Sequence, residues 1–299
     1  MNGIINIYKE KGYTSFDVVA ILRKKLRIKK VGHTGTLDPE AEGVLPVCIG
    51  KATKVADYIT DTTKIYQATM TLGIETDTQD HTGKILNQKE VTSTHEEIEE
   101  AIKSFIGDYK QVPPMYSALK VNGKRLYELA RQGKTVERKA RDIYIYDIEI
   151  IKIEGNNIDI KVECSKGTYI RTLCADIGAE LGCGAHMSKL VRTKSSLFHI
   201  ESSLKLKEID YYIENNSLNE IITNVDQVFA DYGELIIHSK FDKFLYNGNK
   251  LKQEYIKGNK DIAEQTKYRI YDENNNFIGI YRTVIVDESM ILKPVKLFL

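Results

Sequence analysis

One short segment concentrates side chains that could do chemistry. Residues 32–39 read Gly-His-Thr-Gly-Thr-Leu-Asp-Pro and combine an imidazole, two hydroxyls and a carboxylate. Asp38 directly precedes Pro39, which keeps the backbone of Asp38 out of the helical region and stiffens the loop that presents it. A carboxylate with an ordinary pKa of about 3.9 is ionised at neutral pH, and its oxygen can attack an electrophilic carbon. A simple Asp-Pro turn has the same residues, so both interpretations stay open here.

Two other motifs are incomplete. Gly43 and Gly50 suggest a phosphate-binding loop, but six residues separate them where that loop has four, and Ala52 replaces the hydroxyl that holds magnesium. Cys183 and His186 have a spacing used by zinc ligands, but no second close pair of cysteines accompanies them. The sequence therefore predicts no nucleotide cofactor and no metal.

Charge is distributed in blocks, although the formal net charge is only +1. Residues 110–141 contain nine Lys or Arg and two Asp or Glu, interleaved with Tyr116 and Tyr127. Residues 1–64 and 161–207 are also basic, and the intervening segments are acidic. If the basic blocks converge on one face, they form a surface for a polyanion. Arginine, lysine and tyrosine together are typical of surfaces that bind RNA phosphates and bases.

The elements that must position Asp38 come from the first third of the chain. Residues 3–8 predict a short strand, and the Thr-Ser pair at 14–15 can cap an amphipathic helix. Residues 32–50 match neither the strand nor the helix period, so we expect a long ordered loop with short elements, the kind of segment that carries function. Residues 65–72 alternate as a half-buried strand with Tyr66 on its inward face.

Later elements are also periodic. Thr94 and Glu97 form a capping box before an amphipathic helix, and a second helix is expected at residues 125–132. Two apolar runs, 143–153 and 158–164, are joined by Gly-Asn-Asn and predict a hairpin. One further helix follows, with its apolar stripe on Ile170, Leu173, Cys174, Ile177 and Leu181.

The order of these elements contains no regular strand–helix–strand repeat, which favours an α+β fold over a doubly wound sheet. Beyond residue 226 the chain changes to short alternating apolar runs broken by Asn-rich turns, typical of a small all-β module. We expect the boundary at residues 232–234.

The composition is that of an ordinary folded chain. The 299 residues are 42% hydrophobic and 28% charged, which excludes a disordered chain and suits two domains. No apolar run approaches the roughly 18 residues of a membrane span, and the N-terminus lacks a basic region followed by an apolar one. Four cysteines in so long a chain are no disulfide framework. We expect a cytoplasmic protein with reduced cysteines and no membrane contact.

Residues 32–39, continued by Glu-Gly-Val-Leu-Pro-Val-Cys-Ile-Gly-Lys-Ala-Thr at 42–53, closely resemble the active-site region of the TruB-type tRNA pseudouridine synthases. Three further blocks match in order: Lys-Ile-Tyr at 64–66 with Leu-Gly-Ile-Glu-Thr-Asp-Thr-Gln-Asp at 72–80, Val-Pro-Pro-Met-Tyr-Ser-Ala-Leu-Lys at 112–120, and Cys-Ser-Lys-Gly-Thr-Tyr-Ile-Arg at 164–171 with Leu-Gly-Cys-Gly-Ala-His at 181–186. Four separate segments in the right order make a chance match implausible.

The resemblance has limits. The family often has Lys-Pro where this chain has Lys9-Glu10, and residues 208–232 match nothing distinctive. The last 65 residues resemble the small RNA-binding PUA module through size, position and the pattern Phe-Ile-Gly-Ile at 277–280. The implied organisation is a pseudouridine synthase catalytic domain at 1–232, built on a mixed, mostly antiparallel sheet with flanking helices, and a PUA-like RNA-binding domain at 233–299.

The implied reaction breaks the N1 glycosidic bond of a uridine, turns the base and rejoins it through C5, with no cofactor. The resemblance assigns the nucleophile to Asp38, which attacks the ribose, attacks the base or acts at C2′ in a glycal route. It assigns two further catalytic residues. Tyr66 stacks against the extruded uracil and helps to move a proton, and Arg171 pairs with Asp38 and holds it ionised, since a guanidinium lowers a carboxylate pKa.

The implied substrate contacts are His33, Tyr66, Tyr169 and Leu190 near the base, and Lys54, Lys120, Lys166 and Arg192 at phosphates. His33 resembles the family residue that fills the stack vacated by the extruded base, whose removal costs a few kcal/mol. Without the resemblance, His33 is more typical of a loop histidine and the four cations of surface charge. Tyr66 and Leu190 would then be core residues and Tyr169 a solvent-facing one.

We therefore expect isomerisation of the T-loop uridine at position 55 of tRNA by a monomer. The T arm should contact the catalytic domain and the acceptor side the C-terminal module, and the shape of the loop should matter more than its base sequence. The alternative is a non-catalytic RNA-binding or tRNA-folding protein of the same fold. Asp38, Tyr66 and Arg171 argue against it, because a retired active site need keep none of them.

Overall fold

The computed structural model describes residues 1–121, 123–258 and 261–299. The strands of the larger sheet are β1 (Gly3–Lys9), β2 (Val31–His33), β3 (Glu42–Ile49), β4 (Lys64–Leu72), β7 (Gly107–Gln111), β10 (Arg141–Glu154), β11 (Asn157–Cys164), β12 (Ala185–Ser195), β13 (Phe198–His199) and β14 (Ile222–Thr223). Their order is β14-β1-β3-β12-β4-β11-β10-β7, with β2 paired to β3 and β13 to β12. Among the described pairings of this sheet only β3 with β12 is parallel.

The α-helices are α1 (Ser15–Leu26), α2 (Ala56–Thr60), α3 (His95–Lys103), α4 (Leu126–Arg131), α5 (Ile170–Glu180), α6 (Glu208–Glu214) and α7 (Asp242–Tyr246). Short 3₁₀ helices are η1 (Gly50–Val55), η2 (Ile200–Ser202), η3 (Leu218–Ile221), η4 (Val225–Phe229), η5 (Ser239–Phe241) and η6 (Gln253–Tyr255). Two small hairpins pair β5 (Ile74–Thr76) with β6 (Ile85–Gln88) and β8 (Lys120–Val121) with β9 (Lys124–Arg125). Within the described residues, no helix has the length and apolar character that crossing a membrane requires.

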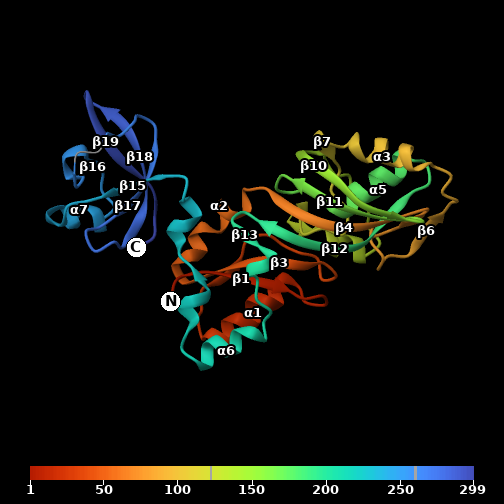
Figure 1. Cartoon of the computed structure of the whole chain (residues 1–299), viewed down its shortest axis with the longest axis horizontal. Helices are drawn as coiled ribbons and strands as arrows, with labels where there is room; N and C mark the ends of the chain where they lie inside the picture. Colours follow the sequence, from red (N-terminus) through yellow and green to blue (C-terminus); the bar gives the residue numbers. More distant parts are fainter. Residues whose placement is uncertain (122, 259–260) are drawn as a thin grey trace.

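The larger sheet packs against helices in two cores, one on each side of the β3–β12 junction, and a third cluster formed with η1 and α2 covers the other face of β1 and β3. One core packs α1 and α6 on β1, β2 and β3, and the other packs α3 and α5 on β4, β10, β11 and β12. Figure 1 shows these helix pairs at opposite ends of the sheet. The loop that carries Asp38 enters the sheet at Glu42, where β3 meets β12, so it lies at the junction of the two halves.

Most of the expected elements are confirmed, including the α+β class. Thr14 caps α1 and Thr94 caps α3, each through a complete capping box. The hairpin of β10 and β11 and the buried stripe of α5 are present as predicted.

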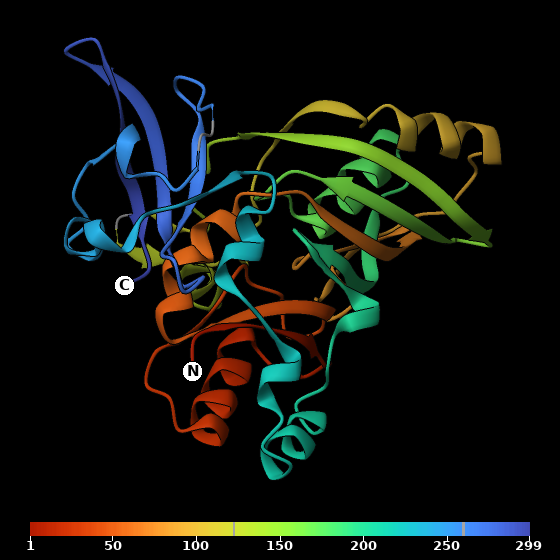
Figure 2. The same cartoon turned by 60° about the vertical axis from the view of Figure 1, so that its left-hand side comes forward.

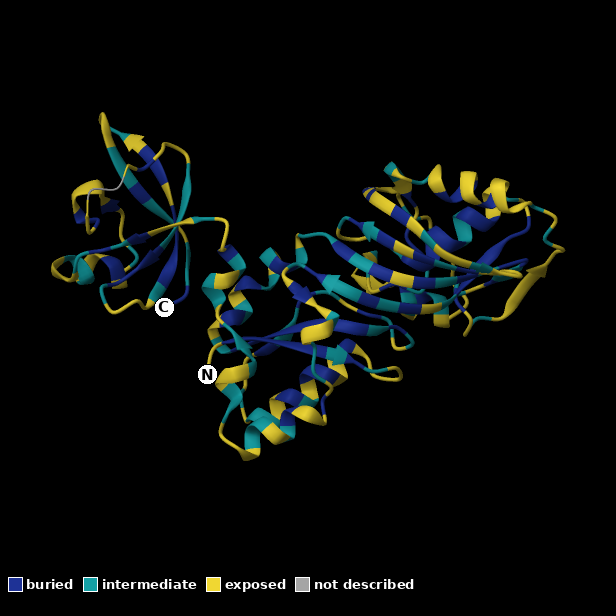
Figure 3. Cartoon of the chain, viewed as in Figure 1, coloured by how far each residue is buried: buried dark blue, intermediate teal, exposed yellow. Residues whose placement is uncertain are grey.

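The expectation of a long ordered loop with short elements over residues 32–50 is only partly confirmed, because one of its elements is a full strand. Residues 42–49 form β3, of which seven of eight residues are buried. The strand lies between β1 and β12 and is covered on both faces, so its sequence is a continuous apolar run without alternation. Figure 3 shows β1 and β3 almost entirely buried, in contrast to the exposed outer face of α3. Only residues 34–41 remain as loop.

The second sheet is made of β15 (Gly233–Ile236), β16 (Leu251–Lys252), β17 (Lys267–Tyr271), β18 (Phe277–Val286) and β19 (Ser289–Leu297) in the order β15-β17-β18-β19-β16. This confirms the small C-terminal β module. An aromatic cluster joins it to the rest: Phe229 contacts Tyr58 at 5.0 Å, Phe277 at 6.4 Å and Phe298 at 6.0 Å between ring centroids. In Figure 2 the connection from α6 rises past α2 into this module.

Candidate active site

Hydrogen bonds from α1 and β1 hold the backbone on both sides of Asp38. The Ser15 hydroxyl at the start of α1 accepts from the Leu37 amide at 2.9 Å and donates to the Leu37 carbonyl at 3.2 Å. On the other side, the buried Lys9 ammonium donates to the Pro39 carbonyl at 3.1 Å. The end of β1 and the first turn of α1 therefore fix the loop that presents the Asp38 carboxylate.

Arg171 contacts most of the other residues of the site. It is 4% exposed, and its Nη2 lies 3.3 Å from Asp38 Oδ2 while its Nη1 lies 3.7 Å from Asp80 Oδ2. Nη2 also donates to the Tyr116 carbonyl at 2.6 Å. The guanidinium carbon lies 5.9 Å from the centre of the Tyr169 ring. The structure thus brings Asp38, Arg171 and Tyr169 together from a loop and the start of one helix.

Asp80 is a site residue that the sequence reading missed. It is 7% exposed, and its Oδ1 accepts hydrogen bonds from the hydroxyls of Thr78 and Thr82 and from the Thr82 amide. Its other oxygen faces Arg171. In the sequence, Asp80 is an acidic residue flanked by threonines at the end of the 72–80 block. Nothing in that pattern indicates that Asp80 lies near Arg171.

The electrostatics of Asp38 correct one expectation. Its side chain is 38% exposed, yet burial on its other sides raises the carboxyl pKa above its ordinary value. Arg171 lowers the pKa and Asp80 raises it, and the net direction is upward. Pairing with Arg171 therefore limits the effect of burial and does not push the pKa below normal. A carboxylate made less stable in this way is a stronger nucleophile when ionised.

Tyr66 lies on β4 with 9% of its surface exposed, in the same apolar cluster as Leu37 and Leu190. Burial raises the pKa of its phenol, and Arg192, its cross-strand partner on β12, opposes that effect. Leu190 is 8% exposed and pairs with Ala68 beside it. These residues form an apolar wall next to the Asp38 loop.

His33 ends β2, one residue before the loop begins. Its Nδ1 is buried and has no hydrogen-bond partner among the described residues. Burial and the charge of Arg192 lower the pKa of the ring, so it is neutral at pH 7. A neutral imidazole is suited to stacking.

Arg192 is a correction. It is 1% exposed, with Nε donating to the Val44 carbonyl at 2.8 Å and Nη2 to the Gly35 carbonyl at 3.2 Å. This burial contradicts the prediction that it contacts a phosphate. Its guanidinium instead ties the Asp38 loop, through Gly35, to β3 and β12.

The three predicted phosphate-binding lysines make no hydrogen bond or ion pair with Asp38 or Arg171 among the described residues. Lys54 donates to the Leu297 carbonyl of the C-terminal module at 3.0 Å, and Lys166 pairs with Asp61 at 2.6 Å. Lys120 is exposed at the start of β8. Among the described residues, none of the three lysines contacts the Asp38 carboxylate.

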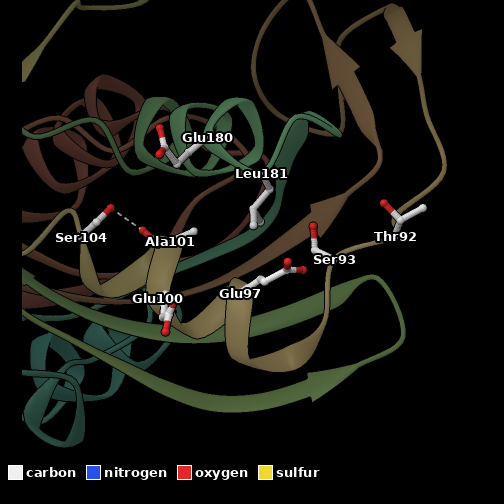
Figure 4. A pocket seen from close by; sticks show the side chains of 8 residues that line it. All are labelled: Thr92, Ser93, Glu97, Glu100, Ala101, Ser104, Glu180 and Leu181. Carbon is white, nitrogen blue, oxygen red and sulfur yellow. Dashed lines mark hydrogen bonds between the residues drawn. The ribbon is translucent and has the colours of Figure 1, made fainter.

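A separate hollow of about 600 Å³ opens between α3 and α5. Figure 4 shows its lining, which includes Glu97, Glu100 and Glu180. It contains none of the predicted site residues, and its carboxylates would repel a polyanion.

Comparisons with known proteins agree with this arrangement. The family model for the N-terminal domain of TruB family pseudouridylate synthases matches residues 23–170, and the model for the C-terminal domain of tRNA pseudouridylate synthase B matches residues 171–230. The second match includes most of the 208–232 segment, in which the sequence reading found nothing distinctive.

Relatives and solved structures match over nearly the whole chain. The tRNA pseudouridine synthase B of Clostridium novyi is 52% identical over 94% of this chain and 95% of its own length. That of Lachnoclostridium phytofermentans is 48% identical over the full length of both. An H/ACA RNP bound to a substrate RNA containing 2′-deoxyuridine is 25% identical with a TM-score of 0.73, and a Cbf5-Nop10-Gar1 complex is 27% identical with a TM-score of 0.72; each match covers 99% of this chain and 85% of the other. This chain belongs to the TruB family of pseudouridylate synthases.

Proposed function

We propose that this protein isomerises the uridine at position 55 in the T loop of tRNA to pseudouridine, with Asp38 as the nucleophile. Membership of the family supports the reaction, and relatives at about half identity are named for tRNA. The observation that carries the assignment is the ion pair between Asp38 and the buried Arg171, next to the apolar wall of Tyr66 and Leu190.

The target base must leave its stack before it reaches Asp38. The neutral ring of His33 fills the vacated stack, and Tyr66 stacks against the extruded uracil. The N1–C1′ bond breaks, a C5–C1′ bond forms, C5 loses its proton and N1 gains one. Asp38 forms the transient bond, either at the ribose or at the base, or acts at C2′, and Tyr66 helps to move the proton.

Arg171 holds the Asp38 carboxylate ionised and aimed. Its second contact, with Asp80, fixes the plane of the guanidinium so that Nη2 faces Asp38. Tyr169, whose ring lies over the same guanidinium, contacts the substrate at the mouth of the site.

The RNA backbone is bound by exposed cations at the end of α1. Arg23, Lys24, Arg27, Lys29 and Lys30 are exposed, and no ion pair involves them within the described chain. The Gly50 amide donates to the Lys30 carbonyl, which places the exposed Lys51 beside them. We add these to Lys54, Lys120 and Lys166 as phosphate contacts.

The module at 233–299 contacts the acceptor side of the tRNA, and residues 1–232 form the catalytic domain. One chain supplies Asp38, Tyr66 and Arg171, which supports action as a monomer. A tRNA substrate supports a place in the cytoplasm.

Unmodified tRNA that carries tritium at uridine C5 tests this function. The wild-type protein should release the label and Asp38→Asn should not, with both proteins binding the tRNA equally. Binding without release by either protein would favour the non-catalytic RNA-binding alternative.

A further inference from the structure

The last residue of β7 makes an unusual contact with the start of α5. Gln111 is 1% exposed, and its Nε2 donates to the Tyr169 carbonyl at 3.0 Å. Its Oε1 accepts from the Tyr169 amide at 2.8 Å. One side-chain amide therefore satisfies both backbone groups of the residue that precedes the helix, as a neighbouring strand would.

This contact holds the backbone of the residue from which α5 starts. Tyr169 is the N-cap residue of α5, and its own side chain makes no capping hydrogen bond. The start of the helix is therefore fixed from outside, by a residue 58 positions earlier in the chain. Arg171 is the second residue of that helix. Because each residue of an α-helix turns by about 100°, a shift of the first turn would aim Arg171 away from Asp38.

Gln111 also begins the segment that reaches the other side of Arg171. Five residues later, the Tyr116 carbonyl accepts from Arg171 Nη2. The amide of Gln111 therefore links two supports of the guanidinium, the helix that carries it and the chain that accepts its hydrogen bond.

A second contact joins the same two elements farther from the site. The Tyr109 hydroxyl of β7 donates to Asp176, which lies five residues after Arg171 on α5. The Gln111 side chain also hydrogen-bonds the Tyr109 phenol, so the matched control removes the Asp176 side of this second contact and keeps Tyr109. Only the first lies next to residues that face Asp38.

We propose that Gln111 is a positioning residue for the isomerisation, whose side-chain amide holds the first turn of α5 so that Arg171 and Tyr169 face Asp38. This role rests on the proposed function. It predicts that losing the amide slows the chemical step at an unchanged affinity for tRNA.

The test compares Gln111→Met, which keeps the chain length and loses both hydrogen bonds, with Asp176→Ala, which removes the acceptor of the second contact. The measurement is the first-order rate of tritium release with enzyme in excess, together with the Kd for tRNA and the melting temperature. A misplacement of about 1 Å costs on the order of 100-fold in rate, so Gln111→Met should release the label at least tenfold more slowly with a Kd within twofold. Asp176→Ala should melt lower, because the Tyr109 hydroxyl loses its acceptor, but should keep a rate within twofold.

Gln111→Glu gives a second readout, which also serves if Gln111→Met does not fold. An ionised Glu still accepts from the Tyr169 amide but cannot donate to its carbonyl, whereas a protonated Glu can do both. The ratio of its rate to that of wild type should therefore rise as the pH falls from 8 to 6.

Equal rate losses in Gln111→Met and Asp176→Ala, a wild-type rate in Gln111→Met, or a pH-independent ratio for Gln111→Glu would overturn the positioning role. Absence of release by wild type would instead overturn the proposed function.

Discussion

The Asp38 site and the cationic surface at the end of α1 are built in opposite ways. At the site, Arg171 is buried and bound to Asp38, Asp80 and the Tyr116 carbonyl before any RNA arrives. At the end of α1 Arg23 and Lys24 are exposed, and among the residues that the structure describes only Lys25 of this helix has an acidic partner, Asp210. Changes at the site should therefore alter the rate of chemistry, and changes at the surface should alter binding.

The largest effect is expected for Arg171→Ala. It removes the charge that lowers the pKa of Asp38 and the group that aims it, and loss of one such charged donor costs on the order of 100-fold or more. The rate of tritium release should fall by that factor, and its acid limb should move to higher pH because the carboxyl then protonates more easily. Kd for tRNA should change by less than threefold. Equal losses in rate and affinity would place Arg171 with the phosphate-binding cations.

Asp80→Asn tests whether the charge of Asp80 acts on Asp38. The Asp80 charge raises the pKa of Asp38, so its removal should shift the acid limb of the pH–rate profile to lower pH. Arg171 also loses one anchor, and we expect the plateau rate to fall by about tenfold. An acid limb at an unchanged or higher pH would show that Asp80 does not act on Asp38 through its charge.

Arg192→Leu tests the buried arginine to which the resemblance assigned a phosphate contact. It leaves the carbonyls of Val44 and Gly35 without their partner, and we expect the free energy of unfolding to fall by about 2–4 kcal/mol. Urea denaturation measures this loss. The salt dependence of tRNA binding should stay unchanged, whereas a slope reduced by nearly one unit would restore Arg192 as a phosphate contact.

The smallest effect is expected at the surface. Lys29→Ala combined with Lys30→Ala should weaken tRNA binding severalfold and reduce the log–log salt slope by about 0.7–0.9 per lost contact. The rate at saturating enzyme should not change. Lys103→Ala, which removes a surface lysine paired with Glu99 on α3, is the control and should leave both the Kd and the slope unchanged.

The sequence predicts well those elements whose pattern is local. Elements with a local period were found: the capped helices α1 and α3, the hairpin of β10 and β11, and the stripe of α5. β3 was missed because a strand covered on both faces has no alternation. In the C-terminal module, the pattern Phe-Ile-Gly-Ile at 277–280 proved to be the start of a ten-residue strand, β18.

The site was only partly predictable for a physical reason. The resemblance supplied Asp38 and Arg171, but residue types do not reveal burial. Arg192 and Lys54 looked alike in sequence, and only the central place of β12 in the sheet separates them. Asp80 and Gln111 act through contacts with residues tens of positions away, which no local spacing encodes.

The proposed reaction requires the Asp38 carboxylate to meet an extruded uridine. The most direct measurement is a crystal structure of Asp38→Asn bound to an unmodified T-arm hairpin. The account predicts a uridine outside its stack, against Tyr66, with a ribose or base carbon within about 3.5 Å of the residue 38 side chain. A uridine that remains stacked in its loop, or that lies away from Arg171, would contradict it.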